Sequence, residues 1–597
     1  MKQFLGGCMG AFIGVFLGII LLAVLLFAAI TQSIDNTLHS KKIEIRDDKI
    51  NKPVLKLELK GELKEMSRKD WWDFKDVFND KGLVLAQLIR SIKAAAQDEN
   101  IKGLYIKISS FSASLSQREE LHKALEIFKQ SGKWIYVYAD TYFQSDYYLA
   151  SIADTIILHP QGILLWKGLA SQITFYKKAL EKLDIQVQVF RHGKFKSAVE
   201  PFLLEKMSDE NRRQIRSLLI SMWDKILGTV SEHRPISKNK LNTFANELTI
   251  KDAESALQYQ LVDVLADEKT AEQLVLRRVK KDEKQSFVDY YTYQHKALEK
   301  YDKGNPDKIA VIYASGPILT DIEEANSDEV IVPSRFLKMM KKLENNEKVK
   351  AVVLRVNSPG GSAFASEVIW QAIQQLKSKK PVVVSFGEVA ASGGYYISCG
   401  ADYIFTDHHT ITGSIGVFGL LPNIQKLMQK DLGLNTDTVK TNMYADFMNI
   451  WRPVQPKEYE TIMHSIEKVY ATFIDRVSQG RKLDKSYIDS IGQGRVWSGA
   501  DAVKLKLADK VGTLEDAIAY AAQKAHLKEF DILEYPKSQN PLQQILESLN
   551  SKEEDVQEKF LQKQIGNYYK EVHLLLQTLK NHQITYLSLM PYQINIY

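Results

Sequence analysis

The sequence contains few cysteines and no large excess of charge of one sign. Only two of its 597 residues are cysteine, Cys8 and Cys399, and their different contexts argue against a disulfide framework. The 79 lysines and arginines are nearly balanced by 73 aspartates and glutamates, which leaves a net charge of +6. This balance gives no indication of a nucleic-acid-binding protein. With 45% hydrophobic residues, the chain has the composition of an ordinary globular protein of several domains.

The N-terminus carries a long run without charge. Residues 4–30 contain no charged side chain, and this run exceeds the roughly 20 residues that a helix needs to cross a bilayer. It is also longer than the apolar core of a signal peptide and has no clear cleavage site. We therefore predict an uncleaved transmembrane anchor within residues 1–31 and a linker over residues 32–50. Cys8 precedes the apolar core, which argues against a lipoprotein-type cysteine.

The charges that flank this run do not fix its orientation. Lys2 precedes it, and four basic residues follow it, which would place the large portion of the chain inside the cell. Large domains, however, can translocate whatever the flanking charge. The sequence by itself leaves the side of the membrane open.

An internal repeat organises the rest of the chain. Residues 101–154 align without a gap with residues 349–402. The Tyr-Tyr pairs at Tyr147 and Tyr395 are 248 positions apart, and so are Asp154 and Asp402. Matches at a constant spacing indicate a duplication.

Each copy alternates between strand and helix patterns. The strand patterns are "GLYIKI" and "WIYVYA" in the first copy and "AVVLRV" and "PVVVSF" in the second, with amphipathic helices over residues 118–130 and 365–378 between them. This alternation predicts an α/β fold with parallel strands and with sites at the strand carboxyl ends. We place the first repeat at residues 51–300, the second at 301–537 and a helical C-terminal tail at 538–597.

Two glycine-rich segments follow strands of the second repeat. "GEVAASGG" contains Ser392 and Gly393, and "NSPGGS" contains Gly360 and Gly361. A serine nucleophile needs a base and donors for the developing oxyanion, and backbone N–H groups beside glycine can supply the donors. A single glycine-flanked serine is more often part of a turn. Two such strand ends in one unit favour a catalytic site.

A comparison of the two repeats distinguishes a structural turn from a catalytic site. Ser392 aligns with Gln144, and the "PGGS" of residues 359–362 aligns with the "FSAS" of residues 111–114. If the serine and the glycines were needed for folding, both copies should contain them. Their presence in one copy alone indicates function.

The general base is more difficult to find. His408 and His409 lie in a predicted surface turn, and His192 is in the other copy. A lysine can act as a base when burial lowers its pKa, and "VFRHGKFKSAVEPF" places Lys196 among apolar and small residues. Lys194 would share its strand face if the segment is extended, although a solvated Lys194 is the simpler interpretation.

These segments resemble a known protease family. "KFKSAVEPF", "RVNSPGGSAFASEVIW", "VVVSFGEVAASGGYYISCGAD" and "ITGSIGVFG" are similar to the motifs of the signal peptide peptidase A (protease IV) family, peptidase family S49, in its long duplicated form. The resemblance extends from the N-terminal anchor to about residue 530. It implies tandem domains of the Clp/crotonase superfamily.

The resemblance also implies an activity and a site. It implies a membrane-anchored serine endopeptidase on the periplasmic side of the bacterial inner membrane that degrades released signal peptides and other hydrophobic peptides. Ser392 would be the nucleophile and Lys196 the general base, with Ser414 hydrogen-bonded to the lysine. Gly393 with Gly360 or Gly361 would form the oxyanion hole. No metal or cofactor is implied, and the chains are expected to form a homotetramer.

Two alternatives remain at this point. A crotonase-like acyl-CoA enzyme would share the fold and the glycine oxyanion hole, but it would use carboxylates and hardly need an anchor. A non-catalytic membrane scaffold would use Ser392 and Lys196 for structure alone. Substrate binding and the Ser392→Ala variant would separate these alternatives from a protease.

Overall fold

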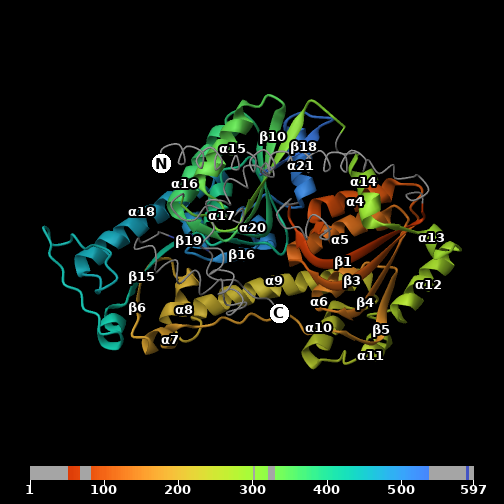
Figure 1. Ribbon diagram of the computed structural model, residues 1–597, viewed down its shortest axis with the longest axis horizontal. Coiled ribbons are helices and arrows are strands. Elements are labelled where there is room, and N and C mark those ends of the chain that lie inside the picture. The colour runs from red at the N-terminus through yellow and green to blue at the C-terminus, as the bar shows by residue number, and fades with distance from the viewer. Residues whose placement is uncertain (1–51, 67–81, 300–302, 321–329, 537–586, 590–597) are drawn as a thin grey trace, which may run out of the picture.

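The structure is a computed structural model that describes residues 52–66, 82–299, 303–320, 330–536 and 587–589. It contains two α/β repeats, whose main sheets lie in separate lobes of the molecule (Figure 1). The predicted transmembrane span over residues 4–30 lies outside the described residues. Within the described ranges, no helix is long and apolar enough to cross a membrane.

The first repeat is built on a seven-stranded parallel sheet. The strand order is β2-β1-β3-β4-β5-β7, and β8 pairs with β1. The strands are β1 (Val54–Lys64), β2 (Leu83–Val84), β3 (Gly103–Ser112), β4 (Trp134–Tyr142), β5 (Thr155–Leu164), β7 (Val264–Leu265) and β8 (Phe287–Asp289). The helices are α4 (Leu85–Gln97), α5 (Leu115–Gln130), α6 (Gln144–Ala150), α7 (Lys177–Lys182), α8 (Glu200–Leu203), α9 (Asp209–His233), α10 (Lys238–Glu247), α11 (Ala253–Gln258), α12 (Glu268–Val279), α13 (Glu283–Ser286) and α14 (Tyr290–Glu299).

The second repeat has an eight-stranded sheet of the same kind. The order is β16-β14-β12-β10-β9-β18, with β13 beside β12 and β17 beside β13, and the pairing is parallel except between β14 and β16. The strands are β9 (Lys308–Ser315), β10 (Val349–Ser358), β12 (Val382–Ala391), β13 (Tyr403–Thr406), β14 (Ile411–Gly413), β16 (Val496–Ser498), β17 (Lys510–Val511) and β18 (Asp531–Tyr535). The helices are α15 (Pro333–Asn345), α16 (Ala363–Lys377), α17 (Gly393–Ser398), α18 (Pro456–Arg481), α19 (Lys485–Ile491), α20 (Gly499–Lys504) and α21 (Leu514–Lys524).

Both main sheets are buried on their two faces. On β9, Ala310 and Ile312 belong to one apolar cluster, whereas Ile309 and Val311 belong to another on the opposite face. Successive side chains of a strand point to opposite faces, so two clusters on one strand mean that both faces are covered. This explains why the strands are nearly continuous apolar runs. The predicted α/β fold with parallel strands is confirmed.

The duplication is visible in matched hydrogen bonds. The hydroxyl of Tyr147 donates to the carbonyl of Leu261 (2.6 Å), and the hydroxyl of Tyr395 donates to that of Leu507 (2.9 Å). Tyr148 and Tyr396 likewise donate to glutamates on α5 and α16, respectively. The four aligned tyrosines therefore fasten the same helix in the same way in each repeat.

One segment of the first repeat crosses to the second. β6 (Gln186–His192) pairs antiparallel with β15 (Val417–Asn423) of the second repeat. α9 then runs below the second repeat and back towards α6 and α10 of the first repeat (Figure 1). Its Gln214 accepts a hydrogen bond from the N–H of Val496 (3.2 Å). The stretch that contains Lys196 therefore lies against the second repeat, although in sequence it belongs to the first.

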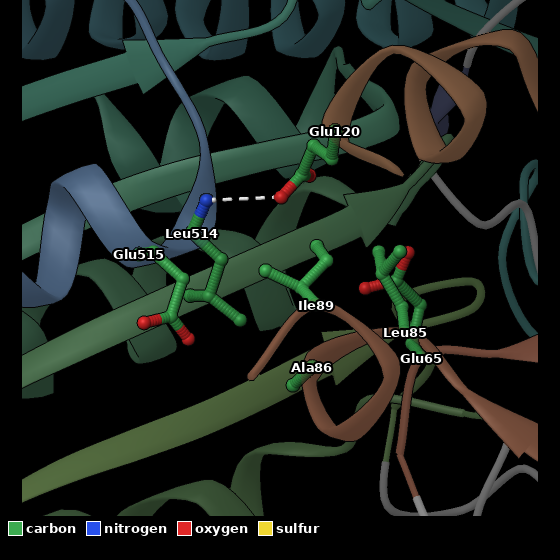
Figure 2. A pocket seen from close by; sticks show the side chains of 7 residues that line it. All are labelled: Glu65, Leu85, Ala86, Ile89, Glu120, Leu514 and Glu515. Atoms are coloured by element: carbon green, nitrogen blue, oxygen red, sulfur yellow. Dashed lines mark hydrogen bonds between the residues drawn. The ribbon is translucent and has the colours of Figure 1, made fainter. Parts of the chain in front are cut away.

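A buried ion-pair cluster ties the repeats together at a second place. Arg355 of β10 is fully buried, and its guanidinium contacts Glu120 (2.6 Å) and Glu65 (3.0 Å) of the first repeat. Glu120 also accepts a hydrogen bond from the N–H of Leu514 at the start of α21 (3.1 Å), beside the small pocket of Figure 2. A buried charge is stable only when it is paired, so this contact needs both repeats.

The predicted C-terminal tail is described only at residues 587–589. These three residues form β19 (Leu587–Leu589), a strand that lies between β11 (Gly360–Ser362) and β15. Together with β6 they complete a four-stranded sheet. The helical structure predicted for the tail concerns residues outside the described part of the chain.

Candidate active site

Ser392 lies at a sharp turn between a buried strand and a helix. β12 ends at Ala391 and α17 begins at Gly393, while Ser392 adopts φ 56° and ψ −115°. This conformation costs a non-glycine residue about 1–3 kcal/mol. The N–H of Ser392 donates to the carbonyl of Gly413 (2.8 Å), and its carbonyl accepts from the N–H of Tyr396 (2.8 Å). The turn is therefore held from both sides, which fixes the direction of the buried hydroxyl.

Lys196 reaches the same place from the first repeat. It follows β6 and precedes the short helix Ser197–Val199. The N–H of Phe195 donates to the carbonyl of Gln493 (2.9 Å) in the second repeat. Gln214 on α9 donates to the carbonyl of Phe195 (3.2 Å) and to the hydroxyl of Ser197 (3.1 Å). The backbone is thus anchored on both sides of Lys196.

Gly494 makes the close approach of Lys196 possible. Its φ is +80°, and a Cβ at this position would lie 2.5 Å from the Cβ of Lys196. A larger residue would therefore displace the lysine. The sequence gives little sign of this role, since the glycines of "IGQGR" are typical of any turn. Gln214 gives no sign either, because its partners come from a distant loop.

The structure brings Lys196 and Ser392 into direct contact. The Nζ of Lys196 lies 2.8 Å from the Oγ of Ser392. Both side chains are 0% exposed. Burial lowers the pKa of Lys196 well below its usual value, because the charged ammonium loses its hydration. The geometry therefore combines a hydroxyl with an amine that can accept its proton.

Ser414 completes the surroundings of the lysine. The Nζ of Lys196 donates to the Oγ of Ser414 (3.0 Å) and lies 3.2 Å from its carbonyl oxygen. Ser414 has φ 51°, and its N–H donates to the carbonyl of Arg495 (2.7 Å). The Nζ of Lys196 is therefore held between Ser414 and the Oγ of Ser392.

The three predicted oxyanion-hole glycines also lie together. A Cβ on Gly393 would be 3.1 Å from the backbone nitrogen of Gly361 and 3.1 Å from the Cα of Gly360. A Cβ on Gly361 would be 1.9 Å from the carbonyl oxygen of Ile318, so only glycine fits there. The backbone of β11 therefore passes directly beside the start of α17. The N–H of Gly393, which directly follows Ser392, and the neighbouring backbone of Gly361 are therefore candidates for binding an oxyanion.

β19 lies beside this backbone as an antiparallel strand. Ser588 is the partner of Gly361, and Leu587 is the partner of both Ser362 and Phe418. An extended peptide thus fits between β11 and β15, next to the serine and the glycines. Main-chain pairing of this kind is a recurring mode of peptide recognition.

The other sequence candidates lie away from the serine hydroxyl. Lys194 is exposed, in agreement with a solvated lysine. His408 and His409 lie in a turn, as predicted, and His408 is partly exposed, but the predicted surface position is wrong for His409, which is 2% exposed. Burial lowers its pKa to about 4. α5 of the first repeat and Tyr148 cover this turn, and the local sequence cannot reveal a cover that comes from the other repeat.

Two family models match this chain. The model described as Peptidase family S49 matches residues 127–282 and 374–528, once in each repeat. The chain belongs to peptidase family S49. It is therefore a serine protease, and the acyl-CoA enzyme and the non-catalytic scaffold are set aside. The model described as Clp protease matches residues 321–407, which agrees with a Clp-like fold of the second repeat.

Several curated proteases are similar to this chain over most of its length. Protease 4 of Haemophilus influenzae is 38% identical and covers 73% of this chain and 72% of its own length. Protease 4 of Salmonella typhi is 36% identical over 78% of this chain and 76% of its own length. The chloroplastic serine protease SPPA of Arabidopsis thaliana is 32% identical over 83% of this chain and 73% of its own length.

Proposed function

We propose that this S49 protease is an endopeptidase with a Ser392/Lys196 dyad. The observation that carries the proposal is the 2.8 Å contact between Lys196 Nζ and Ser392 Oγ at a fully buried position. A lysine whose pKa is lowered by burial is neutral over more of the pH range, so it can act as a base. Ser414 would orient the amine by accepting one of its hydrogens.

The proposed reaction proceeds in two halves. Neutral Lys196 accepts the proton of the Ser392 hydroxyl as Oγ attacks the scissile carbonyl carbon. The N–H groups of Gly393 and Gly361 would bind the resulting oxyanion. The protonated lysine then gives its proton to the leaving amine as the C–N bond breaks. Water, activated by the same lysine, hydrolyses the acyl-enzyme and releases Ser392.

The proposed substrate is an extended, apolar peptide that takes the strand position now filled by β19. The pairing of Leu587–Leu589 with β11 supports this position. The class of substrate is supported by a relative named putative signal peptide peptidase SppA of Enterococcus faecium, which is 33% identical over 40% of this chain. Released signal peptides, which have apolar cores, are the proposed natural substrates.

We also propose where the protein acts and how it assembles. The uncharged run of residues 4–30 supports a single-pass anchor in a bacterial inner membrane, with the catalytic part on the periplasmic side. A homotetramer is supported by exposed apolar side chains within residues 427–450. These are Leu432, Leu434, Val439, Met443 and Tyr444. Exposed apolar patches commonly mark contacts between chains.

The test is cleavage of a synthetic signal peptide by the purified full chain and by Ser392→Ala. The intact chain should cleave the peptide and should be labelled at Ser392 by a serine-reactive phosphonate, located by mass spectrometry. Ser398→Ala provides a control, since Ser398 is a buried serine of α17 whose hydroxyl donates to Gly394. Labelling at another serine, or full activity of Ser392→Ala, would overturn the dyad.

A further inference from the structure

A second cluster of ionisable side chains lies on the first repeat, away from Ser392. His122 and Glu126 are one turn apart on α5, and His233 is the last residue of α9. The Nδ1 of His122 is 3.2 Å from the Oε1 of Glu126, and the Nε2 of His233 is 3.8 Å from the same oxygen. One ligand atom from each residue lies within 4.8 Å of the other two.

These separations suit a small, four-coordinate ion. Bonds of 2.0–2.1 Å to nitrogen and oxygen in a tetrahedron place ligand atoms about 3.3 Å apart. The distances of 3.2 and 3.8 Å require only small side-chain shifts to reach that value. Glu126 is partly exposed, so the fourth position would be open to water.

Each histidine has one buried ring nitrogen without the hydrogen bond that a buried imidazole usually makes. His122 is 2% exposed. The Nε2 atoms of His122 and His233 are both buried and have no hydrogen-bond partner among the described residues. A buried polar atom without a partner costs free energy. Coordination of His233 Nε2 by a cation would remove one such cost.

The charge at this cluster is also favourable. The Glu126 carboxylate lies between the two imidazoles and supplies the negatively charged ligand atom of the cluster. Among the described residues, its ion-pair partners are the two histidines, and no lysine or arginine pairs with it. An arriving cation would therefore meet a carboxylate that no described lysine or arginine neutralises.

The neighbouring cluster of Glu119, Asp407 and His408 is less suitable. It has similar ligand spacing. However, Lys225 lies 3.2 Å from Glu119, and Lys123 lies 3.8 Å from it. These ammonium groups already neutralise the carboxylate and would repel a metal ion. The two clusters can therefore be separated by experiment.

We propose that His122, Glu126 and His233 bind one divalent transition-metal ion, with zinc as the best fit. Two imidazoles and one carboxylate are typical zinc ligands, whereas calcium and magnesium prefer oxygen ligands alone. The ion would fasten the C-terminal end of α9 to α5. The other end of α9 carries Gln214, which holds the loop on both sides of Lys196. The metal would thus stabilise the helix that positions the lysine, without touching the reacting atoms.

The test is a titration of the chelator-treated full chain with Zn²⁺ alone, in competition with a chromophoric chelator. We expect one ion per chain, a rise in the melting temperature on binding, and visible absorption bands of a four-coordinate site when Co²⁺ replaces Zn²⁺. His122→Ala and His233→Ala should each weaken binding by at least about tenfold, since even the loss of a residue that hydrogen-bonds to a metal ligand has an effect of that size. Glu126→Gln changes a ligand at a partly exposed position and should also weaken binding. It provides the test if a histidine variant fails to fold.

Two matched controls make the assignment specific. His408→Ala removes a ligand of the neighbouring cluster, and His192→Ala removes a histidine that pairs with a single carboxylate, Glu467 (2.7 Å). Both variants should bind Zn²⁺ as the parent chain does. The proposal is overturned if the parent chain binds no zinc, if His122→Ala and His233→Ala bind as tightly as the parent, or if His408→Ala abolishes binding.

Discussion

The first turn of α6 in the first repeat and that of α17 in the second occupy the same place on duplicated scaffolds. In the second repeat this place holds Ser392 and Gly394, beside Ser366 of α16. In the first repeat the aligned residues are Gln144, Asp146 and Arg118. Arg118 and Asp146 form a buried ion pair (2.6 Å), and Arg118 also donates to the carbonyls of Phe111 and Ala113.

The comparison separates what the fold needs from what the reaction needs. The tyrosine contacts are the same in both repeats. Gln144, in contrast, accepts hydrogen bonds from the N–H groups of Lys167 (3.1 Å) and Gly168 (2.9 Å) and so serves a structural purpose. In the first repeat the ion pair and the Gln144 amide occupy the positions that serine and glycine occupy in the second repeat. The duplicated fold therefore accommodates either large polar residues or small residues at this turn.

The largest expected effect comes from the lysine that links the repeats. Lys196→Met should lower kcat on a signal peptide by at least about 10³-fold, because dyad members act as one unit. Lys194→Met, two residues away and exposed, should retain kcat within a few-fold. Steady-state kinetics of both variants, with circular dichroism to verify folding, would check this. Equal losses in the two variants would contradict the buried contact.

The ion pair of the first repeat should matter for stability but not for chemistry. Asp146→Ala leaves the Arg118 guanidinium buried without its partner, which typically costs about 3–5 kcal/mol of unfolding free energy. Arg118→Met with Asp146→Leu should recover most of that loss. Urea unfolding and kcat would be measured for each. A loss of kcat in a variant that remains folded would mean that the first repeat takes part in the reaction.

The pH dependence tests the state of Lys196. Burial lowers its pKa in the folded protein well below 10.5, so the protonated, inactive form prevails only at lower pH. The rate should rise with pH, by about tenfold per unit below that pKa, and then level off. Between the folded pKa and 10.5 the unfolded chain binds more protons, so unfolding free energy should also rise with pH. An acidic optimum for activity would contradict the base assignment, and Lys196→Met should lack this part of the stability increase.

Ser414 has a smaller expected effect. Ser414→Ala removes one acceptor for Lys196 Nζ but leaves the carbonyl contact of 3.2 Å. A hydrogen bond to a charged or polarised group contributes about 1.5–3 kcal/mol, so kcat should fall by about ten- to 100-fold. KM should change little, because the contact is with the base and not with the peptide. An unchanged kcat would remove Ser414 from the site.

The smallest effect is expected for the chain's own strand. Truncation after residue 586 removes β19 and frees the position beside β11. KM for an extended apolar peptide should fall by a few-fold while kcat is retained. Replacement of residues 587–589 with three prolines, which cannot donate to the pairing, should act in the same direction. A higher KM in both variants would show that β19 helps to build the substrate site.

Much of the scaffold was predictable from sequence. The constant spacing between Tyr147 and Tyr395 revealed the duplication, and apolar runs revealed strands such as β4 and β12. Ser392 could be selected because its aligned position holds Gln144. The burial of His409 could not be predicted, because its ring packs against Tyr148 of α6, more than 250 positions earlier in the chain.

The sequence by itself therefore determined the repeated strand–helix order and the residue types of the site, since these follow from periodicity and alignment. The sequence favoured Lys196 over Lys194, but only the tertiary structure decided that the Lys196 amine contacts Ser392. Lys194 and Lys196 are two positions apart, yet one is exposed and the other fully buried. The difference arises because β6 pairs with β15 and Gly494 leaves room for one side chain. Burial depends on what the rest of the chain brings to a residue, and that is a property of the folded protein.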